Sequence, residues 1–335
     1  MKIKLKLIVI VESIAIALLI AYVGYLRFHK PDMEIGPQKT GLLSPRIYAG
    51  ILKPKSFLIS NFEPLRDKLE DYIKKYNLNV SIYVQNLRNG AEMEINGDIG
   101  LFPASLNKLP IGVLVLQEIE RRQLRLDSTI HINGSDKNDP SSELYGTNQS
   151  DFTVKFLLEE MLQKSDNTAF YALLAAINKN DLAALLNYFN LDPESTYLMS
   201  KGVQDMKNVP NFVSPKDVSN MFRSLYLSTV LEQNDSEYLL TLLTDTVFDI
   251  KKVAALPANV MISHKYGSFY GGSSKYFHDC GIIYSGDSRI LYCIMTKDMD
   301  NKEAILSTGI FVNAIYNYLN VTRTVLDVYK ERGYI

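Results

Sequence analysis

The sequence has few of the residues that bind metal ions or build disulfide frameworks. Its 335 residues include two cysteines, Cys280 and Cys293, and four histidines. Two cysteines are too few for a disulfide framework. Neither a C-x-x-C nor an H-E-x-x-H spacing occurs, so no metal site is indicated. The sequence also lacks a glycine-rich phosphate loop, and we expect chemistry that needs no cofactor.

The chain also has no excess of charge of either sign. It carries 36 basic and 37 acidic residues, a formal net charge of −1, with no long basic run. This composition gives no electrostatic reason to expect a nucleic acid as partner. Hydrophobic residues make up 47% of the sequence, which is enough for a sizeable core in one large domain or two ordinary ones.

Residues 1–30 contain a long apolar stretch. Three lysines within the first six residues precede an apolar run over 7–26 that is interrupted by Glu12. About 20 residues of this kind can cross a bilayer, and the preceding lysines favour a cytoplasmic N-terminus with the remainder exported. A cleaved signal peptide is the alternative, but no A-x-A-like cleavage site follows the run. We expect residues 1–30 to be a membrane anchor or signal-anchor.

The rest of the chain divides into a linker and a globular domain. Residues 31–58 are rich in proline and glycine and have little apolar periodicity, as in a linker. We place the globular domain at 59–335. It opens with a helical pattern over 63–76, and the alternation that follows predicts a hairpin turning at Asn89-Gly90.

Strand patterns lie at both ends of this domain, with helical patterns between them. Residues 103–243 are mostly helical in pattern, whereas "ANVMISHKYG", "FHDCGIIYSG" and "RILYCIMTK" near the C-terminus are rich in β-formers and are followed by a last helix. This order predicts an α+β fold with one mainly antiparallel sheet built from both chain ends, flanked by helices, and an inserted helical lobe. A cleft between sheet and lobe is the expected place for chemistry.

The stretch "PASLNKLP" (103–110) places a serine and a lysine three residues apart at the start of a helical pattern. Ser105 and Lys108 then share one face, and an unprotonated lysine amine can take the proton of a serine hydroxyl. The alternative is a helix-capping serine beside a solvated lysine. Two later stretches bear on this choice: "KSDNTA" (164–169) at a helix boundary, and "HKYG" (264–267), which closes a predicted strand.

Taken in this order, the three stretches resemble the signature of the class A β-lactamases and related penicillin-recognising enzymes, S-x-x-K, S-D-N and K-T-G. The similarity runs over roughly residues 60–320. It includes "HDCGIIY", which is similar to the family's strand after K-T-G. The resemblance implies a β-lactamase-like fold with a five-stranded sheet and an inserted all-helical lobe.

The resemblance also implies catalytic roles for four side chains. Ser105 would attack an activated carbonyl and become acylated. Lys108 would take its proton, with a pKa depressed by burial and by the charge of Lys265. Ser165 would relay that proton to the leaving nitrogen, and Lys265 would lower the barrier electrostatically and attract a carboxylate.

Four further residues match the family's substrate-binding positions. Asn167 would hold the amide side chain of the substrate. Tyr266 and Gly267 complete the third motif, and the backbone N–H groups of Ser105 and Ser268 would form the oxyanion hole. The substrates implied are β-lactams or the D-Ala-D-Ala-like peptides of peptidoglycan.

Two departures from the family pattern bear on function. The family's deacylating glutamate, in an E-x-x-L-N stretch, has no match here. The nearest carboxylates are Glu194 and Asp205, and we expect both to be solvated loop charges rather than a deacylating base. Tyr266 replaces the family's threonine or serine and sets its hydroxyl several ångströms further out. Lys275 or His278 could compensate in carboxylate recognition, unless both are simply surface residues.

Cys280 and Cys293 lie on the two arms of an expected hairpin that turns at 285–287. An offset of one residue would send them to opposite faces of the sheet, so we expect free buried thiols and no disulfide.

Two functions from different classes fit the sequence. The first is an extracytoplasmic serine hydrolase that either turns over β-lactams or acylates slowly like a penicillin-binding protein. The second is a membrane-tethered, non-catalytic cell-wall scaffold that keeps the fold. A scaffold has no physical need for the three motifs together, which favours the enzyme, whereas the missing glutamate and Tyr266 favour the scaffold.

Overall fold

The computed structural model describes residues 61–137, 139–140, 142–189, 213–271 and 274–331, with side chains up to 318. The expected anchor (1–30) and linker (31–58) lie outside these ranges. Within the described part of the chain, no helix has both the length and the apolar character needed to cross a membrane.

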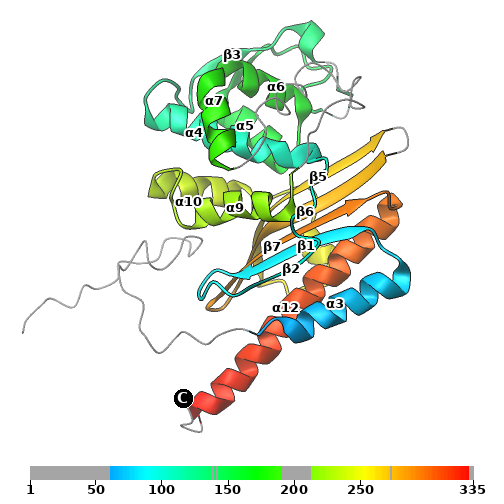
Figure 1. Ribbon diagram of the computed structural model, residues 1–335. Coiled ribbons are helices and arrows are strands. Elements are labelled where there is room, and N and C mark those ends of the chain that lie inside the picture. The colour runs from blue at the N-terminus through cyan, green and yellow to red at the C-terminus, as the bar shows by residue number, and fades with distance from the viewer. Residues whose placement is uncertain (1–60, 138, 141, 190–212, 272–273, 332–335) are drawn as a thin grey trace, which may run out of the picture.

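A five-stranded sheet forms the centre of the domain. Its strand order is β2-β1-β7-β6-β5, and all neighbouring strands are antiparallel. The first two strands come from the N-terminal side of the domain and the other three from the C-terminal side, which confirms the predicted topology (Figure 1). The strands are β1 (Val80–Asn86), β2 (Glu92–Ile95), β5 (Met261–Gly271), β6 (Ser274–Ser285) and β7 (Ser288–Lys297).

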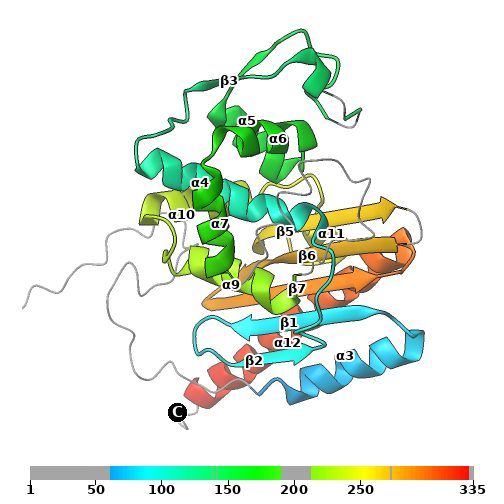
Figure 2. The same ribbon diagram turned by 45° about the horizontal axis from the view of Figure 1, so that its top comes forward.

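The N- and C-terminal helices of the domain cover one face of the sheet. Both α3 (Glu63–Tyr76) and α12 (Asn301–Glu331) pack there beside the short α11 (Ile250–Val253), and Figure 2 shows α3 and α12 on the same side of the strands. Leu65 and Leu69, at i and i+4 on α3, are both buried. Asn77, at φ 49°, ends α3 in the left-handed conformation that asparagine tolerates.

The other face of the sheet carries the inserted lobe. Its core joins the sheet residues Tyr83 and Met295 to buried residues of the lobe helices. These helices are α4 (Lys108–Glu120), α5 (Val154–Gln163), α6 (Asn167–Ala176), α7 (Lys179–Tyr188), α9 (Pro215–Tyr226) and α10 (Gln233–Leu242).

The lobe also contains a two-stranded antiparallel sheet, which differs from the expected all-helical lobe. The strands are β3 (Thr129–His131) and β4 (Asp151–Thr153), and β4 leads directly into α5. Each strand has three residues, too few to show the alternation of apolar and polar residues that predicts a strand.

The cysteines form a disulfide, so the prediction of free thiols is wrong. The turn of the β6–β7 hairpin pairs Ser285 with Ser288, and this register places Cys280 directly opposite Cys293, with the Cα atoms 3.9 Å apart. Gly286, at φ 51°, adopts the positive φ that such a two-residue turn needs. The sequence pattern left the register open by one residue, and the turn decides it.

Candidate active site

Ser105 lies in a tight turn that leads into α4. The turn is the 3₁₀ helix η2 (Ala104–Asn107), and Ala104 enters it with a left-handed φ of 47°. The β5 backbone packs directly against the turn, because a Cβ on Gly267 would lie 2.9 Å from the Ser105 nitrogen and 3.1 Å from the Pro103 oxygen. Only a glycine permits this approach. Because Ser268 follows Gly267 directly, its backbone N–H lies near the backbone of Ser105.

Lys108 Nζ lies 2.9 Å from Ser105 Oγ, and the serine does not cap the helix. The amine also donates to two atoms that can only accept, the Ser165 carbonyl oxygen and Asn167 Oδ1, both at 2.7 Å. These two bonds use both hydrogens of a neutral amine. The lone pair is then left facing Ser105 Oγ, in position to accept the hydroxyl proton.

Burial makes the protonated form of this amine acidic enough to lose its proton near neutral pH. Lys108 is 2% exposed, and this desolvation lowers its pKa to about 7, although the carboxylates of Asp166 and Asp139 act in the opposite direction. The charge of Lys265, which the sequence analysis gave as a second cause, is not needed. The amine is therefore neutral in a substantial fraction of molecules at pH 7.

Ser165 lies between the two lysines. Its Oγ is 3.0 Å from Lys265 Nζ and 3.4 Å from Lys108 Nζ. Ser165 has a left-handed φ of 62°, and the next residue, Asp166, caps α6 by accepting a bond from the Ala169 N–H. The S-D-N stretch is thus a helix boundary, as predicted. Its serine hydroxyl is in reach of two amines, as a proton relay requires.

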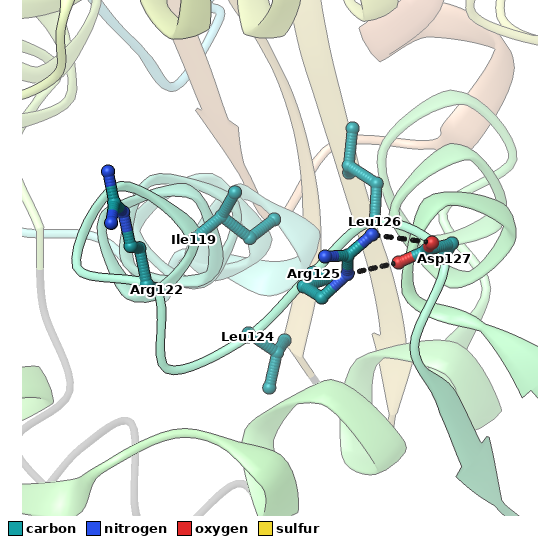
Figure 3. Close-up of a pocket in the computed structure, with 6 residues that line it drawn as sticks. All are labelled: Ile119, Arg122, Leu124, Arg125, Leu126 and Asp127. Carbon is teal, nitrogen blue, oxygen red and sulfur yellow. Dashed lines mark hydrogen bonds and ion pairs between the residues drawn. The ribbon is translucent and has the colours of Figure 1, made fainter.

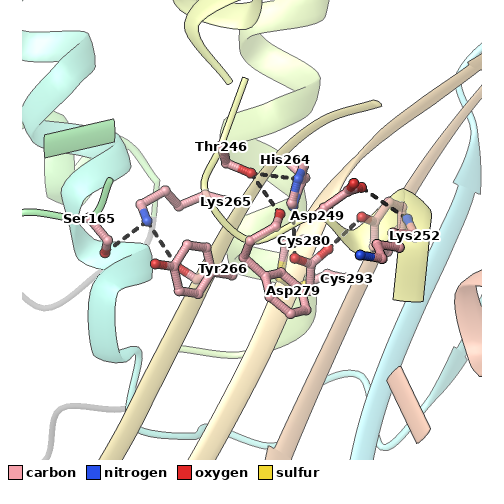
Figure 4. Close-up of polar contacts among 12 residues, drawn as sticks. Ser165, Thr246, Asp249, Lys252, His264, Lys265, Tyr266, Asp279, Cys280 and Cys293 are labelled. Atoms are coloured by element: carbon pink, nitrogen blue, oxygen red, sulfur yellow. Dashed lines mark hydrogen bonds and ion pairs between the residues drawn. A yellow bond between two sulfur atoms is a disulfide. The ribbon is translucent and has the colours of Figure 1, made fainter. Parts of the chain in front are cut away.

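Lys265 projects from the middle of β5 toward Ser165 (Figure 4). The strand continues to Gly271, so the K-Y-G stretch does not close it as expected. The Lys265 side chain is fully buried, and burial together with the neighbouring charge of Lys108 lowers its pKa well below the usual value. Asp279, on the adjacent strand β6, opposes this lowering.

A buried polar network follows Lys265 across the sheet. His264 Nδ1 lies 2.8 Å from Asp279 Oδ2, Tyr292 donates to the other carboxylate oxygen, and Thr246 Oγ1 is 2.8 Å from His264 Nε2 (Figure 4). Thr246 donates its one hydroxyl hydrogen to the Phe248 carbonyl oxygen, so its oxygen accepts the hydrogen bond from His264 Nε2–H.

Comparisons with known proteins agree with this arrangement. The model of the β-lactamase enzyme family matches residues 64–319. The chain belongs to this family. VEB-1, a β-lactamase from Pseudomonas aeruginosa, is 20% identical over 239 residues, covering 67% of this chain and 79% of VEB-1.

Solved structures of similar fold include β-lactamases and the protein PBP-A. The TLA-3 extended-spectrum β-lactamase superposes with a TM-score of 0.68 at 17% identity, covering 77% of this chain and 99% of that one. A PBP-A variant, solved as an acyl-enzyme complex with penicillin G, gives a TM-score of 0.64 at 21% identity, covering 78% and 99%. The predicted class A β-lactamase family and fold are confirmed, and this family member is a β-lactamase-like serine hydrolase.

The remaining predicted positions of this β-lactamase-like enzyme lie along β5 and the neighbouring strand β6. The Tyr266 ring packs against the Phe248 ring, with their centroids 5.3 Å apart, and Lys265 Nζ lies 4.5 Å from the Tyr266 centroid. Ser268 is exposed. His278 is fully buried and neutral, since burial lowers its pKa to about 4, and its Nε2 donates to the Phe102 carbonyl at 2.7 Å. It therefore holds the segment before Ser105 and does not reach out to a substrate carboxylate, while Lys275 is exposed.

Sequence reasoning missed Asp139, whose Oδ2 accepts a 2.8 Å hydrogen bond from Asn167 Nδ2. No motif marks this residue. The only signal in the sequence is a carboxylate in the polar, proline-containing break over 133–149, which by itself indicates a loop. The structural role of His278 was also missed, because nothing in a strand pattern identifies a buried histidine.

The lobe has a hollow at the end of α4, away from Ser105 (Figure 3). The Arg125–Asp127 ion pair, at 2.8 Å, lies at its edge. It contains none of the residues described above. Its lining residues are Ile119, Arg122, Leu124, Arg125, Leu126 and Asp127.

Proposed function

We propose that this enzyme is acylated at Ser105 by β-lactams or by the D-Ala-D-Ala-like peptides that they mimic. The observation that carries the proposal is the Lys108 amine. It is buried, its pKa is about 7, and its two fixed acceptors leave the third direction to Ser105 Oγ at 2.9 Å. A solvated lysine beside a capping serine would have none of these features.

The acylation step follows from these contacts. Neutral Lys108 takes the proton of Ser105 Oγ as the oxygen bonds to the carbonyl carbon. The C–N bond of the substrate then breaks. Ser165 gives its hydroxyl proton to the leaving nitrogen and regains one from Lys108 or Lys265, both of which it contacts. The backbone N–H groups of Ser105 and Ser268 would hold the oxyanion.

We expect deacylation to be slow. The E-x-x-L-N stretch is missing from the sequence, and Glu194 and Asp205 lie outside the described residues. Within the described residues, Ser105 Oγ forms a hydrogen bond with the Lys108 side chain, and no carboxylate hydrogen-bonds to it.

The proposal places the domain outside the cytoplasmic membrane, tethered by residues 1–30. The apolar run near the N-terminus supports the tether. The Cys280–Cys293 disulfide supports an oxidising compartment, since disulfides persist there and are rare in the cytosol.

Two aromatic contacts favour an enzyme over a non-catalytic scaffold. A scaffold of this fold would have its cleft filled by aromatic side chains of β5. Instead the Phe269 ring packs against Phe102 at 5.2 Å, and Tyr270 donates to Asn301. Both rings are engaged with neighbouring segments of the structure.

Intact-protein mass spectrometry tests the proposal. The purified full-length chain is mixed with benzylpenicillin and followed over hours beside a Ser105→Ala control. We expect an adduct of one penicillin that persists and is missing from the control. An adduct that decays while product accumulates would retain Ser105 as nucleophile but overturn slow deacylation. No adduct with benzylpenicillin or with a cephalosporin would overturn the proposed function.

A further inference from the structure

The Lys265 amine is held by Tyr266 as well as by Ser165. Lys265 Nζ donates to Ser165 Oγ and to the Tyr266 carbonyl oxygen, both at 3.0 Å. It also lies over the Tyr266 ring, 4.5 Å from the centroid (Figure 4). An ammonium group has three N–H donors, so two point to oxygen atoms and the third is left for the face of the ring. Tyr266 therefore contacts this amine through both its backbone and its side chain.

The Tyr266 ring belongs to a small aromatic stack at the edge of the sheet. Its centroid lies 5.3 Å from that of Phe248, and Phe248 meets Phe277 edge to face at 5.2 Å. Phe248 lies just before α11 and Phe277 lies on β6, so the stack joins two neighbouring segments to the edge strand β5. These contacts fix the ring beside the Lys265 amine.

The charge of Lys265 depends on opposing influences. The side chain is fully buried, and burial together with the charge of Lys108 lowers its pKa, whereas Asp279 on β6 raises it. The face of an aromatic ring carries partial negative charge and attracts a cation, more strongly where water is excluded. The Tyr266 ring thus acts in the same direction as Asp279 and favours the charged amine.

We propose that Tyr266 is a positioning residue whose ring holds the Lys265 ammonium charged and directed at Ser165. This proposal rests on the proposed function and deepens it, because Lys265 acts there by its charge and by its contact with Ser165. Threonine or serine, the family's residues at this position, have no ring and cannot make this contact. A cation–ring contact away from water changes the ratio of charged to neutral amine by about tenfold, which corresponds to about one pH unit.

The alkaline side of the pH profile measures this effect. Acylation of the full-length chain by benzylpenicillin is followed by intact mass from pH 7 to pH 10.5, where the rate should fall once Lys265 loses its proton. Tyr266→Leu removes the ring, and Tyr266→Phe keeps the ring without its hydroxyl. Phe248→Leu leaves Tyr266 and Lys265 in place and removes the support of the ring. Tyr270→Leu, which removes a ring four residues further along β5, is the matched control.

We expect Tyr266→Leu to lower the midpoint of this alkaline loss by about one pH unit. Tyr266→Phe should restore the wild-type midpoint, Phe248→Leu should lower it by a smaller amount, and Tyr270→Leu should not move it. Urea unfolding of each variant serves as the folding control, because a loss of stability alone reduces the rate at every pH without moving the midpoint. If Tyr266→Leu does not fold, the midpoint of Phe248→Leu decides.

Three results would overturn the proposal while leaving acylation intact. They are an unmoved midpoint in both Tyr266→Leu and Phe248→Leu, a shift in Tyr266→Phe as large as that in Tyr266→Leu, and an equal shift in Tyr270→Leu. A wild-type chain that benzylpenicillin acylates at no pH would overturn the proposed function as well.

Discussion

At the scale of single residues, the protonation state of Lys108 controls the expected chemistry. Only the neutral amine can accept the Ser105 proton, and burial lowers its pKa to about 7. Since the neutral form is lost below this pKa, acylation by benzylpenicillin should fall about tenfold for each pH unit below 7 and level off above it. Initial rates by intact mass between pH 5 and 9 measure this profile. A flat profile would contradict Lys108 as the base.

Gly267 is the glycine at which an added methyl group would press directly on the nucleophile turn. Its Cβ would lie 2.9 Å from the Ser105 nitrogen, so Gly267→Ala should push β5 from the nucleophile turn and slow acylation by about a hundredfold. Gly134→Ala is a matched control, because its Cβ meets nothing within 4 Å. Equal acylation rates in the two variants would show that the close approach is not needed.

The sequence allowed part of this site to be predicted at the residue scale. The contact between Ser105 and Lys108 is local, three positions along one turn, and follows from helical geometry. The contact between Asn167 and Asp139 joins positions 28 apart through a loop. No periodic pattern places a loop side chain, so this carboxylate could be found only from the structure.

At the scale of elements, the β6–β7 hairpin carries the disulfide. Cys280 and Cys293, 13 positions apart, close a short loop whose cross-link restricts the unfolded chain. Replacing both with serine should lower the free energy of unfolding by about 3 kcal/mol, seen as a lower urea midpoint. A reductant should lower the wild-type midpoint similarly and leave the double variant unchanged. Identical midpoints for oxidised and reduced wild type would contradict the disulfide.

Strand existence was predictable from the sequence, but strand register and very short strands were not. The three long C-terminal strands, each of ten or more residues, are rich in aromatic and β-branched residues. The pairing of Cys280 with Cys293 depends instead on a two-residue turn at Gly286. A slip of one residue at this turn would move every side chain to the opposite face of the sheet. Because these strands carry apolar residues on both faces, the sequence pattern does not distinguish the two registers.

At the scale of the whole molecule, the two ends of the domain meet in one sheet, with β1 hydrogen-bonded to β7. This arrangement was predictable because strand patterns occur only at the two ends of the domain. The sheet therefore needs both ends, and α12 covers it on the face opposite the lobe (Figure 1). The active site draws its residues from both parts, with Ser105 on the lobe side and Lys265 on the sheet.

The first half of α12 should be essential for folding and the remainder dispensable. Phe311, Val312 and Ile315 are fully buried against the sheet, and exposing side chains of this size costs about 2 kcal/mol each, a large part of a domain's stability. A chain ending at Asp300 should therefore not fold. A chain ending at Tyr318 should keep its melting temperature within about 2 °C, because it retains these contacts. Circular dichroism melts compare the two truncations with the full chain, and unfolding of the longer one would show that residues 319–335 make contacts the domain requires.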